Sequence, residues 1–195
     1  MSFDLDRSLR RFKPQRRRSG LRRRADEELP QISEQPAGGL DLLLDTCVYI
    51  DILQGRAPEP VKRLLGIRVC HHSGVALAEL THLFGRLDPG DNRTRAVLAE
   101  LAGTISQIPQ HRLRAPSLGA LGEAGILAGL VARLTNLEVR RRQPLFNDAA
   151  LYLQAVENEQ VVLTRNLRDF DCFDQLLPCG RVLLYRRTPA SLRQS

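Results

Sequence analysis

Tryptophan is absent from this 195-residue sequence, and no apolar run approaches the roughly 20 residues needed to span a bilayer. The N-terminus also lacks the apolar segment of a signal peptide, so we expect a cytoplasmic protein with no membrane partner. The four cysteines form no C-x-x-C pair and accompany no histidines at zinc-ligand spacing, which excludes a zinc finger and indicates reduced thiols. A Gly-rich phosphate loop is also missing, which argues against a P-loop nucleotide-binding protein.

Lysine is scarce, yet arginine gives the chain a formal net charge of +7. Such a charge favours a polyanionic partner, because clustered cations bind phosphates and release counterions. Residues 1–40 hold ten basic and six acidic groups, so the remainder carries only +3. Residues 1–39 are also poor in aliphatic side chains, and we expect a disordered basic arm. This arm is either an unstructured extension without a function of its own or a segment that anchors RNA or contacts an acidic partner. The candidate RNA-binding arginines of this arm are Arg16, Arg17, Arg18, Arg22, Arg23 and Arg24.

From Leu40 onward the pattern becomes that of a folded domain, expected over residues 40–187 and followed by a tail at 188–195. Short continuous apolar runs are typical of strands buried on both faces of a parallel sheet. Strands alternating with helices predict an α/β fold with a mostly parallel central sheet. Strands are expected at 42–44, 161–163 and 181–185, with an extended piece at 67–70 and a basic loop at 140–144. Helices are expected at 48–53, 58–65, 73–86, 92–102, 117–137 and 147–158, and a turn with a helix at 168–176.

Polar residues follow two of these strands directly. Asp45 and Thr46 follow the first strand, and the run Thr164-Arg165-Asn166 follows the strand at 161–163. In open parallel sheets the ligand crevice lies outside the carboxyl ends of the strands, which makes these residues candidates for a site. Asp45 is equally suited to capping the helix that begins near residue 48.

Two further acids lie on helices at positions that favour a role inside the molecule. Glu79 lies at the edge of an apolar stripe rather than opposite it, and Asp148 projects onto the apolar face of its helix. A carboxylate on an apolar face is unfavourable unless it is paired or bound to a metal. Asp148 could instead be a first-turn acid that is stabilised by the helix dipole.

A fourth acid, Asp169, closely follows Asn166 and precedes Phe170, a candidate core residue; Asp171 and Asp174 are near enough to be confused with it. If Phe170 points into the core, Asp169 should face the crevice, and Asp171 and Asp174 should face solvent. Carboxylates converging on a strand-end crevice suit Mg²⁺ or Mn²⁺. Such a site would hydrolyse phosphodiester bonds, because the metal polarises phosphoryl oxygens and lowers the pKa of a bound water.

Other sites fit the sequence less well. His71 and His72 adjoin a strand, where histidines are more often surface or edge residues than metal ligands. Glu79 and His82 have the Glu-x-x-His spacing of di-iron bundles, but the sequence offers no second such pair on a four-helix bundle. A phosphatase of the Asp-x-Asp type would need an acid at position 47, where Cys47 stands.

Four motifs together resemble the PIN-domain toxins of VapC type, over residues 40–186. Each motif alone is weak, but their order and rough spacing are specific. They are Leu-Leu-Leu-Asp45-Thr46, Ala78-Glu79-Leu80, Asn147-Asp148-Ala-Ala-Leu and Leu163-Thr164-Arg165-Asn166-Leu-Arg-Asp169-Phe170. The resemblance implies a PIN-like α/β/α sandwich, Mg²⁺-dependent endoribonuclease activity, an antitoxin partner and a homodimer.

Carried over onto this chain, the resemblance makes Asp45, Glu79, Asp148 and Asp169 the catalytic and metal-binding acids. Thr46, Thr164 and Asn166 would support the metals or their waters, and Arg165 would contact RNA. The chain departs from the family in its Arg-rich arm and in a long helical stretch over residues 93–133. The alternatives are a PIN nuclease that is not a toxin and an inactive nucleic-acid-binding module anchored by the arm.

Overall fold

The computed structural model of this chain describes residues 3–18, 20–32, 38–88, 90–138, 141–179 and 181–187. Its centre is a five-stranded sheet in the order β3-β2-β1-β4-β5, in which every neighbouring pair is parallel. The predicted α/β class with a parallel sheet is therefore confirmed. The strands are β1 (Leu42–Leu44), β2 (Cys70–Ser73), β3 (Leu113–Arg114), β4 (Val161–Thr164) and β5 (Val182–Leu184).

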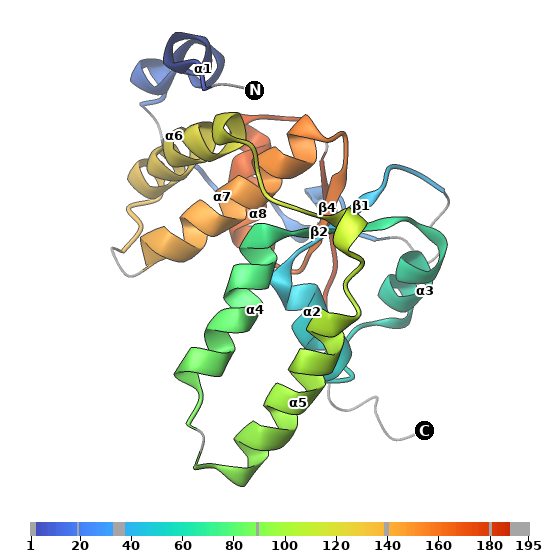
Figure 1. The fold of residues 1–195 in the computed structure, drawn as a ribbon. Helices are drawn as coiled ribbons and strands as arrows, with labels where there is room; N and C mark the ends of the chain where they lie inside the picture. The colour runs from blue at the N-terminus through green and yellow to red at the C-terminus, as the bar shows by residue number, and fades with distance from the viewer. Residues whose placement is uncertain are drawn as a thin grey trace.

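Helices cover both faces of this sheet, which explains why β1 is apolar throughout and β4 is apolar up to Thr164. Leu43 packs into the core that contains α6, α7 and α8, whereas Leu42 and Leu44 pack into the core that contains α2, α3, α4 and α5. This alternation follows from side chains pointing to opposite faces along a strand. The layers are visible in Figure 1, where α4 and α5 also project from the body as an antiparallel pair. The helices are α1 (Leu5–Phe12), α2 (Thr46–Leu53), α3 (Glu59–Ile67), α4 (Gly74–Arg86), α5 (Asn92–Ser106), α6 (Leu118–Leu134), α7 (Arg142–Glu157) and α8 (Leu167–Leu176).

Most expected elements are present, and two were misplaced. Ser73 is the N-cap of α4, as expected, and accepts a hydrogen bond from the backbone N–H of Val75. The extended piece expected at 67–70 is wrong, because α3 continues to Ile67 and β2 begins at Cys70. The basic loop expected at 140–144 is also wrong over its described part, because α7 begins at Arg142. Pro144 is compatible with this start, since the first turn of a helix does not use its backbone N–H groups.

The expectation of a disordered arm over residues 1–39 is wrong where that segment is described. Asp4 caps α1 by accepting a hydrogen bond from the backbone N–H of Arg7. Phe12 is only 1% exposed and belongs to the same core as α6 and α7, and Leu29 is buried there too. Two well-placed apolar side chains thus anchor a segment whose composition is otherwise that of a disordered chain.

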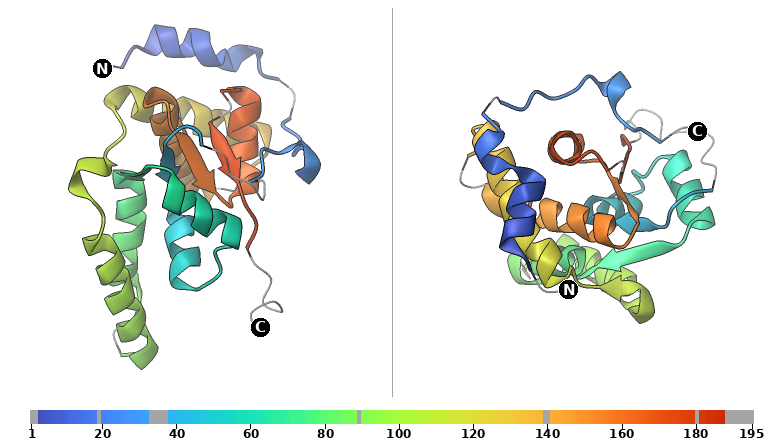
Figure 2. Two further views of the ribbon diagram at one scale, coloured as in Figure 1. Left: turned by 90° about the vertical axis from the view of Figure 1, so that its right-hand side faces the viewer. Right: turned by 90° about the horizontal axis from the view of Figure 1, so that it is seen from above.

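The arm runs over the surface of the domain and ends beside its last strand. Leu21 donates its backbone N–H to Leu134 at the end of α6. Further on, Leu184 of β5 donates to Pro30 at 2.9 Å, and Ile32 donates to Leu184 at 2.8 Å. Figure 2 shows α1 lying across the helical layer, far from the α4 and α5 pair. Residues 33–37 and the expected tail at 188–195 lie outside the described residues.

Two further expectations concern the cysteines and membrane-spanning helices. All four cysteines are free thiols, as the sequence predicts. No helix in the described part of the chain is both long and apolar enough to cross a membrane.

Candidate active site

The carboxyl ends of β1 and β4 meet at the centre of the sheet. From β1 the chain continues to β2 and β3 on one side, whereas β4 is followed by β5 on the other. This is a topological switch point, where the loops after two neighbouring strands diverge and leave a crevice. Asp45 follows β1 here, and its backbone N–H donates to the carbonyl of Leu163 in β4 at 3.2 Å.

Asp45 is buried, and its side chain faces the crevice. It occupies the N-cap position of α2, but its side chain makes no capping hydrogen bond, so the helix-cap interpretation of its carboxylate is wrong. The carboxylate instead accepts hydrogen bonds from the Thr164 hydroxyl and, at 2.9 Å, from the Cys47 thiol. Burial raises the pKa of Asp45, the two hydrogen bonds oppose that rise, and the charge of Glu79 adds to it.

Glu79 joins three helices through its carboxylate. Thr46 of α2 donates its hydroxyl to Oε2 at 2.6 Å, and Asn147 of α7 donates its side-chain amide to Oε1 at 2.7 Å. Both donors are neutral, so these hydrogen bonds orient the Glu79 carboxylate without pairing it with a cationic side chain. Its half-buried position on α4 agrees with its expected place at the edge of the apolar stripe.

Asp148 lies in the second turn of α7, because this helix begins at Arg142. The alternative of a first-turn acid stabilised by the helix dipole is therefore wrong, since that effect is confined to the terminal turn. Asn166 donates its amide to Asp148 Oδ2 at 2.8 Å. The pKa of Asp148 is raised well above its ordinary value, first by burial and then by the charges of Asp45, Asp169 and Glu79. The four acids predicted from the sequence thus act on one another electrostatically.

The structure separates Asp169 from the two acids that the sequence could not distinguish from it. The Asn166 amide donates to Asp169 at 3.1 Å, and Arg141 donates to the same oxygen at 3.3 Å. Asp171 and Asp174 bind Arg24 of the arm instead. We expected both to face solvent, but Asp171 is only 1% exposed, because Arg24 covers it. Phe170 is buried in the core, as expected.

These side chains border a hollow of about 560 Å³, called here the acidic cleft. Asp169, unlike Asp45, Glu79 and Asp148, is not among the residues that line it. Among the described residues, no three acidic, histidine or cysteine side chains are close enough as they stand to hold one metal ion. The lining residues are Arg23, Asp45, Thr46, Cys47, Ile50, Glu79, Pro144, Asp148, Arg165, Asn166, Leu167, Arg168 and Arg186.

The predicted RNA-binding arginines fall into different groups. Arg23 and Arg165 line the acidic cleft, and Arg165 is also ion-paired, with its Nε 2.9 Å from the buried Asp51. Arg24 is bound to α8, and Arg17 donates to a backbone carbonyl of that helix. The other arm arginines, Arg16, Arg18 and Arg22, are exposed and line none of the cleft.

Several residues at the site were not predicted from the sequence, among them Asn147, Cys47, Arg168 and Arg186. Asn147 orients Glu79, and the Cys47 thiol donates a hydrogen bond to Asp45. Arg186 lines the cleft from the segment after β5. Asn147 directly precedes Asp148, and Cys47 lies two positions after Asp45, so proximity to a predicted acid could have indicated both. Nothing in the local sequence marks Arg186, whose place depends on the sheet order.

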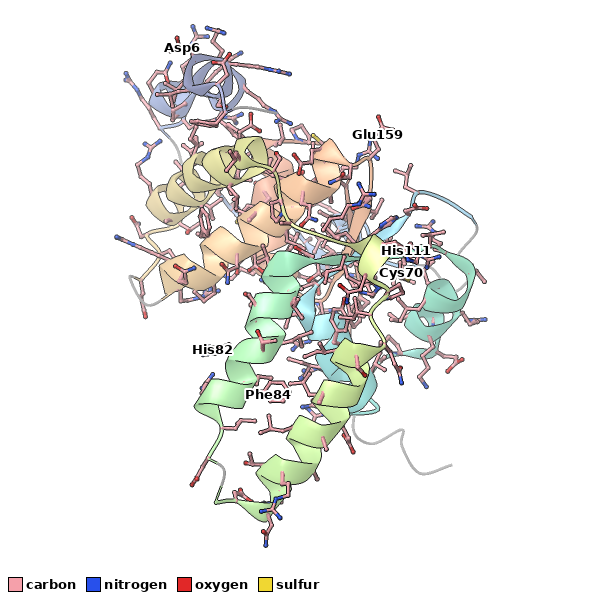
Figure 3. The ribbon with its side chains drawn as sticks, in the orientation of Figure 1. Asp6, Cys70, His82, Phe84, His111 and Glu159 are labelled. Atoms are coloured by element: carbon pink, nitrogen blue, oxygen red, sulfur yellow. The ribbon has the colours of Figure 1, made fainter. Side chains whose placement is uncertain are left out.

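The histidines considered as metal ligands lie elsewhere. His72 is buried against Tyr49, with its Nδ1 2.5 Å from the Tyr49 hydroxyl, and His71 pairs with Asp41. His82 is exposed on α4, away from the sheet (Figure 3). The expectation of surface or edge histidines is therefore wrong for His72, which is buried.

The order of the sheet, the helical layers on its two faces and the crevice at its centre are those of the PIN-like α/β/α fold that the resemblance implies. Solved structures with this fold include FitAcB from Neisseria gonorrhoeae, at 20% identity and a TM-score of 0.52, covering 74% of this chain and 96% of that one. VapBC2 from Rickettsia felis, bound to a DNA fragment from its promoter, matches at 15% identity and a TM-score of 0.51, with 74% and 97% covered. DNA-bound VapBC from Salmonella typhimurium matches at 22% identity, with the same TM-score and coverages. No protein-family model and no curated protein matches the chain.

Proposed function

We propose that this protein is a Mg²⁺- or Mn²⁺-dependent endoribonuclease and the toxin of a type II toxin–antitoxin pair. One observation carries the nuclease proposal. Asp45, Glu79 and Asp148 come from three separate elements, yet they line one hollow at the carboxyl edge of a parallel sheet. Unlike a chance surface cluster, these carboxylates are oriented by donors from neighbouring elements.

The donor set suits a hard divalent cation. Carboxylate oxygens are the ligands that Mg²⁺ prefers, and the raised pKa values of Asp45 and Asp148 indicate negative charge in need of compensation. A fully formed protein cage is not required, because Mg²⁺ usually keeps several waters and uses one or two carboxylates together with substrate phosphates. Asp45, Glu79 and Asp148 would hold the ion, with Asp169 supporting them.

A bound ion would polarise the scissile phosphodiester and lower the pKa of a water. The chain's own residues supply position and charge. Thr164 and Asn166 fix the carboxylates of Asp45 and Asp148, while Thr46 and Asn147 fix Glu79. Arg165 and Arg168 line the cleft and would attract the RNA backbone towards an otherwise negative site.

The toxin role is supported by the motifs that resemble VapC-type toxins and by the shared fold with VapBC and FitAcB structures. It implies a cognate antitoxin that binds this chain, and the resemblance also implies a homodimer. Induced expression should arrest growth, and the Asp148→Asn variant should not. Co-expression of a protein encoded next to this chain should relieve the arrest if that protein is the antitoxin. Light scattering of the purified chain would measure the homodimer.

The nuclease is tested by cleavage of single-stranded RNA with Mg²⁺, with Mn²⁺ and with EDTA. Asp45→Asn, Glu79→Gln and Asp148→Asn should each lower the cleavage rate by about 100-fold or more, because losing even an outer-shell partner of a metal typically costs 10–100-fold. Glu59→Gln, on the exposed face of α3, is the matched control and should cleave like the wild type. Metal-independent cleavage, or full activity in Asp148→Asn, would reject the proposal. Metal-independent RNA binding without cleavage would favour the inactive binding module.

A further inference from the structure

A second hollow adjoins the acidic cleft and shares part of its wall. This hollow, of about 720 Å³, lies against the arm and is called here the arm hollow. Arg23 and Arg186 line both hollows. Arg23 comes from the arm and Arg186 from the segment after β5, so two distant parts of the chain place a guanidinium at the boundary. The remaining residues of the arm hollow are Arg22, Arg24, Ala25, Asp26 and Glu28.

Asp26 brings these two arginines together. Arg23 Nη2 lies 2.6 Å from one carboxylate oxygen of Asp26, and Arg186 pairs with the other. The trio therefore carries a net positive charge. The Arg23 and Arg186 side chains are 52% and 55% exposed, so each keeps N–H donors directed to solvent.

Arg24 fixes the backbone beside Arg23. Its backbone N–H and its Nε donate to the two carboxylate oxygens of Asp171, at 2.9 and 2.5 Å, and its Nη2 donates to Asp174 at 2.8 Å. On the other side, the carbonyl of Arg22 accepts a hydrogen bond from Gln175 at 3.0 Å. Both neighbours of Arg23 are thus attached to α8, and the position of Arg23 is set by the folded domain.

We propose that Arg23 and Arg186 form a phosphate-binding subsite for the RNA strand whose scissile bond lies in the acidic cleft. Arg24 is the positioning residue of this subsite. The inference rests on the proposed function. Its physical basis is that a polyanion approaching clustered carboxylates needs adjacent cations, and that the arginine fork matches phosphate oxygens in a bidentate manner. The arm is then part of the substrate site, and most of its other arginines are not.

The test measures the Kd of a single-stranded RNA oligonucleotide as a function of salt, in EDTA, so that a metal-dependent nuclease does not cut it. Arg23→Ala and Arg186→Ala should each weaken binding and reduce the slope of log K against log salt by about 0.7. Arg10→Ala is the matched control, because Arg10 is exposed on α1, lines neither hollow and carries the same charge. In Mg²⁺, the first two variants should raise KM and leave kcat unchanged, as expected for uniform binding.

Asp26→Asn distinguishes phosphate binding from a structural role by the sign of its effect. If Asp26 only holds two surface arginines in place, its loss should weaken RNA binding or leave it unchanged. If the arginines bind phosphate, the loss of the competing carboxylate should tighten binding and steepen the salt slope. Arg24→Lys should raise KM as Arg23→Ala does, because lysine keeps the charge and the backbone hydrogen bond to Asp171 but cannot reproduce the two hydrogen bonds from Nε and Nη2.

The two proposals fail in different ways. If the Arg23→Ala/Arg186→Ala double variant keeps the wild-type Kd and slope, the subsite is rejected, whether or not the enzyme cleaves RNA. If the wild type binds RNA through these arginines but does not cleave it with Mg²⁺ or Mn²⁺, the subsite stands and the nuclease function is rejected. Circular dichroism and thermal melting of each variant exclude misfolding as the cause.

Discussion

Asn166 donates its side-chain amide to Asp148 at 2.8 Å, and the second hydrogen of the same amide is available to Asp169 at 3.1 Å. One neutral side chain thus orients two carboxylates that repel one another. Replacing it removes both hydrogen bonds without removing a charge.

We therefore predict that Asn166→Ala lowers the RNA cleavage rate and raises the Mg²⁺ concentration for half-maximal activity, by about 10- to 100-fold as for other outer-shell residues. Metal titrations of the cleavage rate measure both effects. Asn158→Ala, in the C-cap of α7, is the matched amide control and should leave the metal requirement unchanged. An unaltered metal requirement in Asn166→Ala would mean that the amide does not organise the site.

Asp148→Asn should stabilise the metal-free protein at neutral pH. The pKa of Asp148 is raised in the folded state, so its ionisation opposes folding as pH rises through that pKa. The variant has no carboxyl group at this position to ionise, so it does not lose this stability. Its melting temperature should therefore exceed that of the wild type by several degrees at pH 7. Below the unfolded-state pKa of about 4, residue 148 is uncharged in both the wild type and the variant, and the difference in melting temperature should vanish. A lower melting temperature at pH 7 would mean that the carboxylate is compensated by other groups.

Asp169→Asn should affect mainly the activity, whereas Asp171→Asn should affect mainly the stability. Asp169 borders the acidic cluster, so its replacement should lower the cleavage rate and raise the metal requirement. Asp171 is buried under Arg24, so its replacement should reduce the free energy of unfolding by about 2 kcal/mol, the scale of a charged hydrogen bond. Urea unfolding and metal titration of both variants test this, and a metal effect from Asp171→Asn alone would reverse the assignment of the fourth acid.

Phe12→Ala should destabilise the whole domain. The Phe12 ring is fully enclosed by the core that contains α6 and α7, and truncating such a side chain typically costs about 3–5 kcal/mol. Leu5→Ala, on the same helix but 54% exposed, is the control and should change the free energy of unfolding by less than about 0.5 kcal/mol. Equal unfolding curves for Phe12→Ala and wild type would mean that α1 is not docked in solution.

The elements that were predicted correctly owe their structure to local patterns. Leu42, Leu43 and Leu44 form a strand because an unbroken apolar run fits only between two helical layers, and Ser73 begins α4 because its hydroxyl accepts a backbone hydrogen bond. The proximity of Asp45 and Asp148, which line one cleft, was predicted in the same way, from their unusual positions relative to such patterns.

The elements that were missed depend on contacts between distant residues. Helix α1 lies in a highly charged segment, and its order requires Phe12 to meet α6 more than a hundred residues further along the chain. β3 has two residues and therefore no periodicity to detect. The start of α7 was placed too late, because Pro144 and its neighbouring arginines are typical of a loop when their tertiary partners are unknown.

The bridge between Gln31 and Leu184 also covers part of the outer edge of β5. β5 is an outer strand of the sheet, and an outer strand with free N–H and carbonyl groups is a template for pairing with other chains. The arm occupies the outward N–H and carbonyl of Leu184 through Pro30 and Ile32. A shortened chain that started beyond Ile32 would present a bare apolar edge, and its aggregation in the cell could be mistaken for a loss of activity.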